Sequence, residues 1–144
     1  MKLPVFILLI FWGTFSQAQS KLLTVVSNQD GAPAQLKKSQ VKSIFLGETE
    51  RWPNGNKIKI ALFKPATNSG KTISKKLVDM SADDFAHYWE EQNFSGKNDR
   101  PQYFKNMNDM LVYVSETPGA IGIIDELPAS SGFRFIQVDG KKSF

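Results

Sequence analysis

The apolar positions of the chain form short runs that predict strands, separated by longer segments with helical spacing. The runs at 22–26 and 120–124 are apolar and rich in β-branched residues, which is typical of buried strands. Residues 58–62 alternate between more and less apolar side chains and predict another strand. Phe133 and Phe135 are separated by one residue and predict a last strand near the end of the chain.

Two helices are expected in the first half of the chain. Ser39 is predicted to cap a helix that ends near Leu46, because apolar residues recur there at helical spacing. A second helix is expected from about Lys71 to Asp79, after a loop at 64–70.

An aromatic stripe marks a third helix. Ser81 is a suitable N-cap, and Phe85, Tyr88 and Trp89 follow with the spacing of one helix face, which predicts that this face lies in the core. The longest amphipathic helix is expected to begin at Phe104, from which apolar residues repeat at helical spacing. Strands that alternate with helices in this order predict an α/β protein with a small mixed sheet flanked by helices.

The N-terminal segment has the pattern of a secretory signal peptide. Lys2 is followed by an almost unbroken apolar run at 4–15, and the small residues Ser16 and Ala18 precede a cleavage point before Gln19. The alternative is a membrane anchor, but a span needs about 20 apolar residues. We therefore expect a signal peptide at 1–18, a single domain at 19–144 with no membrane span, and a periplasmic or secreted bacterial product.

The composition limits the chemistry that this domain can perform. The 144 residues are 41% apolar and 22% charged, as in ordinary globular proteins. The absence of cysteine excludes a disulfide scaffold and a thiol nucleophile, and a single histidine argues against a histidine-rich metal site. Export also argues against nucleic-acid binding and cytosolic ATP chemistry. No metal and no cofactor are expected.

The acidic residues and His87 do not suggest catalysis. Adjacent residues of a helix point to different faces, so neighbouring acids are interpreted as solvated or capping groups. They form the pairs Asp83-Asp84, Glu90-Glu91 and Asp125-Glu126. His87 has no nucleophile or orienting partner nearby in the sequence. The chain is therefore expected not to be an enzyme.

The candidate binding site lies where the second predicted helix begins. Ser69, Gly70, Lys71 and Thr72 place hydroxyls, backbone N–H groups and a cation at a helix N-terminus, where anions bind. A nucleotide-binding P-loop is rejected because position 65 is Pro instead of the first glycine of that motif. The alternative is that Ser69 only caps the helix.

Three further cations are secondary candidates. Lys97 and Arg100 make the predicted loop at 94–101 locally basic, and Lys64 precedes the candidate anion loop. Such a basic surface could receive an anion or an acidic partner. The alternative for Lys97 and Arg100 is an ordinary solvated loop.

Several passages resemble the phosphate-binding proteins of ABC transporters over about residues 22–125. They are a helix ending in Ile-Phe-Leu-Gly at 44–47, Trp-Pro-Asn-Gly at 52–55, Tyr-Trp at 88–89, Phe-Ser-Gly-Lys at 94–97 and Pro-Gly-Ala-Ile-Gly at 118–122. In this resemblance Ile44, Phe45 and Trp52 are core anchors. Gly119 and Gly122 let a strand pass close to a neighbouring helix. Trp52 and Trp89 are both expected to be buried.

The resemblance implies the fold of one lobe of a periplasmic binding protein and non-covalent binding of phosphate or another oxyanion. Ser69 and Gly70 match the family's Ser-Gly-Thr loop, but the threonine is displaced to Thr72 and Lys64 is the cation nearest to the family's arginine. The chain matches only one of the family's two lobes. The alternative is therefore a scaffold whose cleft face binds a protein, either a second copy or a component of the cell envelope.

Overall fold

The computed structural model describes residues 21–97 and 99–144, so the predicted signal peptide lies outside the described residues. The described part contains a six-stranded sheet with the order β2-β6-β1-β5-β3-β4. The strands are β1 (Thr24–Ser27), β2 (Gln35–Leu36), β3 (Lys59–Phe63), β4 (Gln102–Phe104), β5 (Ala120–Ile124) and β6 (Arg134–Val138). The predicted α/β class with a small mixed sheet is confirmed.

The sheet is mixed, and its parallel part defines one important edge. β1 is antiparallel to both β5 and β6, whereas β3 is parallel to both β4 and β5. β2 is parallel to β6. The carboxyl ends of β3, β4 and β5 therefore meet at the same edge, which is where α/β proteins commonly bind ligands.

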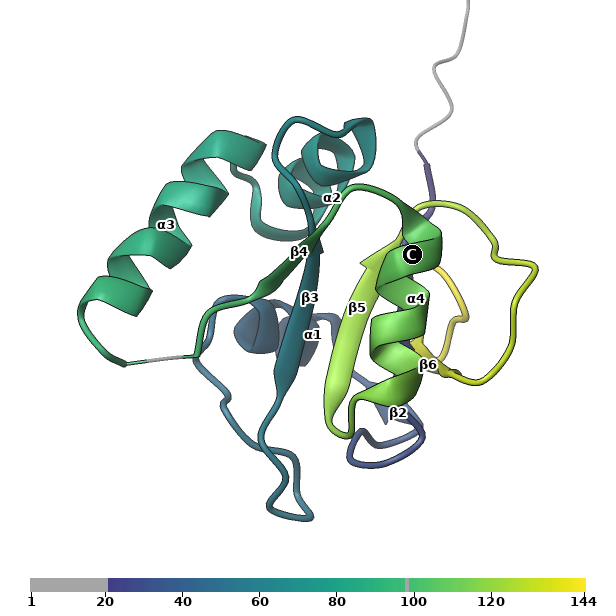
Figure 1. The fold of residues 1–144 in the computed structure, drawn as a ribbon. Coiled ribbons are helices and arrows are strands. Elements are labelled where there is room, and N and C mark those ends of the chain that lie inside the picture. Colours follow the sequence, from purple (N-terminus) through teal and green to yellow (C-terminus); the bar gives the residue numbers. More distant parts are fainter. Residues whose placement is uncertain (1–20, 98) are drawn as a thin grey trace, which may run out of the picture.

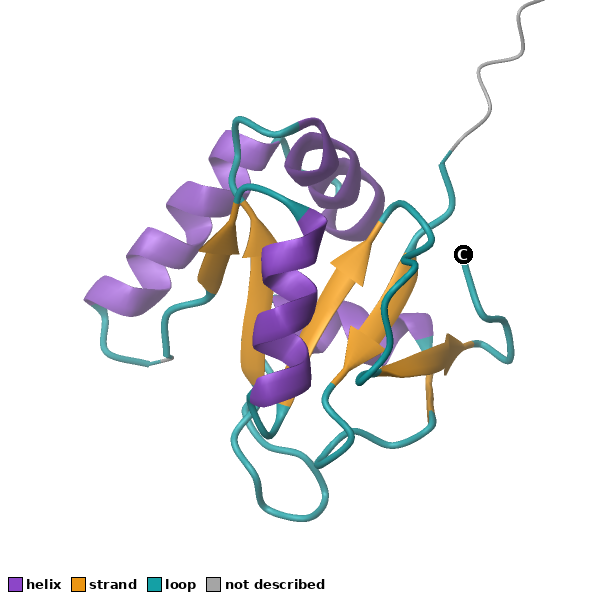
Figure 2. Ribbon diagram, turned by 45° about the vertical axis from the view of Figure 1, so that its right-hand side comes forward, coloured by secondary structure: helices purple, strands orange, loops and turns teal. Residues whose placement is uncertain are grey.

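Four helices of the described residues surround the sheet. They are α1 (Lys38–Phe45), α2 (Asn68–Val78), α3 (Ala82–Phe94) and α4 (Met107–Glu116). Figures 1 and 2 show α4 in front of the sheet and α1 behind it, with α2 and α3 together beside β3. α2 follows the carboxyl end of β3 and packs against α3, which in turn leads back to the beginning of β4.

The two tryptophans expected in the core are buried there, Trp52 at 4% exposure and Trp89 at 3%. The indole Nε1 of Trp52 donates to the carbonyl of Gly119 at 2.9 Å, and that of Trp89 donates to the carbonyl of Phe45 at 3.2 Å. The passages that carry the family resemblance therefore contact one another in pairs. Gly119 has a φ of 80°, which suits glycine at this close approach.

Two predicted helix starts differ from the structure, whereas Ser81 caps α3 as expected by accepting from Asp84 N–H. Ser39 lies inside α1, whose N-cap is Lys37. The side chain of Gln40, three residues into the helix, accepts the N–H of Lys37 at 2.8 Å, which is the reciprocal bond of a capping box. In α2 the cap is Thr67, so the helix begins earlier than position 71 and Ser69 is not its cap.

The fourth helix, unlike the first two, begins later than predicted. Phe104 belongs to β4, Asn106 caps α4, and α4 has 10 residues, compared with 13 in α3. The rings of Phe104 and Tyr113 are 5.2 Å apart. Phe104 thus packs against α4 from a neighbouring strand, which explains why its position fits the helical spacing without belonging to the helix.

The predicted last strand is confirmed as β6. Its buried residues are Ile136 and Val138, whereas Phe135 is 38% exposed on the opposite face. The ammonium of Lys142 lies 4.6 Å from the centroid of the Phe135 ring. This aromatic residue therefore packs on the outside of the sheet, and the aliphatic residues of β6 fill the core.

Candidate functional site

A tight turn connects β3 to α2 and builds the first part of the candidate site. The hydroxyl of Thr67 donates to the carbonyl of Lys64 at 2.7 Å and accepts the N–H of Gly70 at 3.0 Å. A Cβ at Gly70 would lie 2.4 Å from that same carbonyl oxygen, so the turn leaves no room for a side chain. Glycine at position 70 is therefore required by the fold, and its N–H is bound within the loop.

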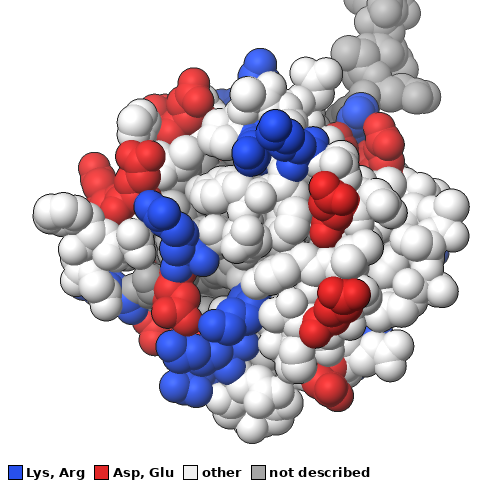
Figure 3. Space-filling view, in the orientation of Figure 1, with Lys and Arg blue, Asp and Glu red and all other residues white. Residues whose placement is uncertain are grey.

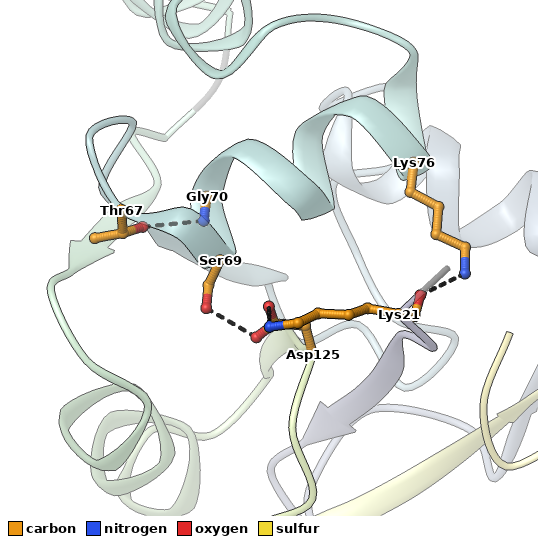
Figure 4. A network of polar contacts seen from close by, with 6 residues as sticks. All are labelled: Lys21, Thr67, Ser69, Gly70, Lys76 and Asp125. Atoms are coloured by element: carbon orange, nitrogen blue, oxygen red, sulfur yellow. Dashed lines mark hydrogen bonds and ion pairs between the residues drawn. The ribbon is translucent and has the colours of Figure 1, made fainter. Parts of the chain in front are cut away.

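The hydroxyl of Ser69 faces a buried carboxylate (Figure 4). Ser69 Oγ donates to Asp125 Oδ1 at 2.8 Å, and the ammonium of Lys21 lies 3.5 Å from Asp125 Oδ2. The side chain of Asp125 is only 3% exposed. Lys76 donates to the carbonyl of Lys21 at 2.7 Å and fixes the position of that segment. On this side of α2 the serine hydroxyl is therefore already hydrogen-bonded.

Asp125 is a site residue that the sequence analysis missed. It was interpreted as solvated charge, but it directly follows β5, at the edge where the carboxyl ends of β3 and β5 meet. The continuously apolar run before it was the available signal, because a polar residue that ends a buried parallel strand commonly lies at a binding edge.

A groove of about 680 Å³ lies between the β3–α2 turn, α3 and β4. Its lining residues are Lys64, Pro65, Ala66, Lys71, Asp83, Ala86, Trp89, Glu90, Arg100 and Tyr103. The structure thus brings together Lys64, Lys71 and Arg100, which the sequence offered as separate candidates. In Figure 3 positive and negative side chains lie side by side around this part of the molecule, near α3.

The three cations of the groove are open to a ligand. Among the residues that the structure describes, none of Lys64, Lys71 and Arg100 forms an ion pair or a side-chain hydrogen bond. Two acids, Asp83 and Glu90, line the α3 side of the same groove. Glu90 lies 3.3 Å from the Nδ1 atom of His87, which is exposed on α3. The groove therefore has a cationic part and a weakly acidic wall.

Two aromatic residues line the groove, and the charged groups around Tyr103 shift its pKa. Burial raises the pKa of the Tyr103 phenol above 10.0, Glu90 raises it further, and Arg100 opposes this shift. Tyr103 is therefore neutral at physiological pH and keeps its proton for donation to a ligand. Trp89, expected only as a core residue, also lines the groove.

The remaining predicted residues lie outside this groove. Lys97 lines a smaller cavity of about 190 Å³, together with Lys57 and Asp99. Lys57 and Lys59 both pair with Asp99, at 3.1 and 3.3 Å. Thr72 is half-buried on α2 and does not line the groove. The predicted anion loop is thus divided: Lys71 faces the groove, and Ser69 faces Asp125.

Neither a metal centre nor a membrane span is found in the described part of the chain. No three side chains among His, Cys, Asp and Glu gather there in a way that could hold a metal ion. None of the helices at 21–97 and 99–144 is long and apolar enough to cross a membrane.

The arrangement of sheet and helices resembles one part of a periplasmic binding protein, as solved structures show. PstS from Borrelia burgdorferi aligns with a TM-score of 0.60 over 83% of this chain and 48% of its own. An ABC-type phosphate transport receptor from Vibrio cholerae aligns with a TM-score of 0.66 over 92% of this chain and 56% of its own.

A third structure, with bound phosphate, is assigned as a phosphate ABC transporter substrate-binding protein from Clostridium perfringens. It aligns with a TM-score of 0.63 over 83% of this chain and 46% of its own. All three are 16% identical to this chain, so the likeness establishes the fold alone. No family model and no curated protein matches the sequence.

The chain spans about half the length of the solved proteins that it matches. The resemblance seen in the sequence passages is therefore confirmed as a shared fold with one part of phosphate ABC transporter substrate-binding proteins.

Proposed function

We propose that the chain is a non-catalytic binding protein that takes phosphate or a related oxyanion in the groove beside α2. The observation that carries this proposal is that Lys64, Lys71 and Arg100 meet in one groove and form no ion pair within the described part of the chain. Charge-assisted hydrogen bonds from lysine and arginine are among the strongest contacts available to an oxyanion. The fold shared with phosphate-binding proteins supports the same ligand class.

The affinity of this site is expected to be modest. Asp83 and Glu90 line the same groove and oppose an anion, and the groove is open to solvent on one side. Tight capture of an oxyanion needs donors on all sides of it. We therefore expect a dissociation constant between about 1 μM and 1 mM for phosphate, corresponding to about 4–8 kcal/mol of binding free energy.

Binding can be tested by an NMR titration of the purified chain with phosphate and sulfate. The proposal expects amide shifts at Lys64, Lys71 and Arg100 that saturate with the anion. The variant Lys71→Ala should weaken binding several-fold, and the effect should shrink as the salt concentration rises. The control Lys105→Ala removes an equally exposed cation outside the groove and should leave the affinity unchanged. Unmoved groove amides at millimolar anion would contradict the proposal.

We also propose that the protein is exported and acts in the periplasm or outside the cell, after removal of residues 1–18. The support is the apolar run at 4–15 followed by Ser16 and Ala18. N-terminal sequencing of the product from the periplasm or medium should find Gln19 first. A membrane-bound product that retains Met1 would disprove it.

The second candidate is a protein-binding module, which docks a second copy of the chain or an envelope protein. The bonding at the start of α2 favours it, because the Ser69 hydroxyl and the Gly70 N–H are already bound by Asp125 and Thr67. This candidate expects no phosphate-dependent shifts at any anion concentration. It also expects an oligomeric state or a partner that blocks the groove, which sedimentation and cross-linking would detect.

A further inference from the structure

The groove is larger than a bare oxyanion requires. Its volume of about 680 Å³ lies within the range of roughly 300–1,000 Å³ in which proteins enclose ligands of drug size. Phosphate has only five non-hydrogen atoms and would fill a small part of this space. The rest of the groove is therefore filled either by water or by the further part of a larger ligand.

The walls that surround this remaining volume are largely apolar. Pro65 and Ala66 contribute from the β3–α2 turn, Ala86 from α3 and Tyr103 from β4, whereas Trp89 is only 3% exposed. Three separate elements thus present carbon surfaces to the same space. Such walls offer no hydrogen bonds to water. An aromatic or aliphatic group that covers them leaves water itself, and this burial of apolar surface favours binding.

The charges within the groove restrict the ligand further. Lys64, Lys71 and Arg100 can neutralise one acidic head group, but Asp83 and Glu90 line the α3 side. A second negative group placed near these acids would be repelled. A ligand that suits the groove therefore carries one acidic head and an uncharged body, and a polyanion does not suit it.

We propose that the groove binds a small organic anion, such as a phosphate monoester, whose head pairs with the three cations and whose apolar body lies against Ala66, Ala86 and Tyr103. This ligand class rests on the proposed function, since its acidic head uses the same three cations. It adds the requirement that the ligand also carries an apolar body. The Tyr103 phenol supplies a further hydrogen-bond donor to the bound molecule.

Phenyl phosphate, inorganic phosphate and benzyl alcohol are suitable probes, compared by NMR titration of the purified full chain. Phenyl phosphate should bind about tenfold more tightly than inorganic phosphate, because part of its ring leaves water. Its titration should also move the amides of Ala66, Ala86 and Tyr103. Benzyl alcohol, which has the ring without the acidic head, should produce no saturable shift.

The other possible outcomes show whether the inference fails alone or together with the proposed function. Equal affinities for phenyl phosphate and phosphate would overturn the inference and leave oxyanion binding standing. Equal affinities for benzyl alcohol and phenyl phosphate would show that the head contributes nothing, and both proposals would fail. Both would also fail if none of the three probes moved the groove amides.

A pair of variants locates the head group. Lys71→Ala should weaken phenyl phosphate binding about fivefold at low salt, because one cation is lost from the head group. Lys105→Ala removes a cation outside the groove and should leave the affinity within experimental error. An equal loss in both variants would mean that phenyl phosphate responds only to the net charge of the protein and would overturn the assignment of the groove.

Discussion

Two regions of the described chain meet at the N-terminal end of α2, one with unpaired cations and the other with a buried, paired carboxylate. In the groove, Lys64, Lys71 and Arg100 are lining residues that form no ion pair with any residue at 21–97 or 99–144. On the Ser69 side, the carboxylate of Asp125 is 3% exposed and is bound by a hydroxyl and an ammonium. A buried charge is stable only when it is paired, whereas an exposed charge can stay open. The paired region is therefore satisfied within the fold, and the open region is the one in which a ligand can gain free energy.

The largest expected effect is a loss of stability when Trp89, which lines the groove and belongs to the core, is truncated. Trp89→Ala should lower the free energy of unfolding by about 3–5 kcal/mol, because a buried ring and its bond to Phe45 are lost. Urea unfolding measures this change. Phe94→Ala, at the end of the same helix and 95% exposed in the wild type, should have almost no effect. Similar losses in both variants would contradict the burial pattern of α3.

The next effect concerns the turn that holds the two regions in place. Gly70→Val should destabilise the protein by roughly 2–3 kcal/mol, since its Cβ would lie 2.4 Å from the carbonyl oxygen of Lys64. Thermal unfolding gives the change. Ala66→Val in the same turn, at an exposed position, is the matched control and should stay within about 0.5 kcal/mol of the wild type. An unchanged stability of Gly70→Val would refute this account of the turn.

A third variant removes the negative charge of the paired region and leaves Lys21 without its ion-pair partner. Asp125→Asn keeps an oxygen that can accept the Ser69 hydroxyl but loses the ion pair with Lys21, and we expect a stability loss of about 1 kcal/mol. Removing this negative charge near the start of α2 should also raise the affinity for phosphate several-fold. Calorimetry and urea unfolding measure both changes. Glu126→Gln, an exposed neighbour, should change neither property.

The smallest expected effect is a pH response inside the groove. Because burial raises the pKa of Tyr103 in the folded state, its contribution to stability is complete below pH 10 and is lost as the pH rises through the folded pKa. Arg100 opposes the shift, so Arg100→Ala should raise this pKa further. An ultraviolet difference titration against Tyr103→Phe isolates the phenol. Lys105→Ala should leave the pKa unchanged, and an equal shift in both variants would contradict a specific contact with Arg100.

The elements with long or continuous apolar patterns were predictable from the sequence. β1, β3 and β5 and the aromatic stripe of α3 are confirmed, because each apolar run or repeat extends over four or more residues. β2 and β4 were not predicted, since strands of two and three residues are too short to show any period. Phe104 was assigned to a helix for the same reason.

The candidate site was predictable only in its residue types. The sequence identified Lys64, Lys71 and Arg100 as cations near a helix start or in a loop, but all of α3 separates Arg100 from the other two. The pairing of β4 with β3 returns the chain to the same edge and brings Arg100 and Tyr103 to the groove. Sequence spacing carries no information on such a return.

The sequence by itself determined the class of fold, the buried tryptophans and the cationic character of the site, because these depend on patterns within single elements and on residue type. The tertiary structure decided which groups are already bound and which are open. It placed Asp125 against Ser69 and left Lys71 facing the groove, although Ser69 and Lys71 are only two residues apart. The physical reason is that neighbouring residues of a helix point in different directions, so their partners come from whichever strand ends lie beside each face.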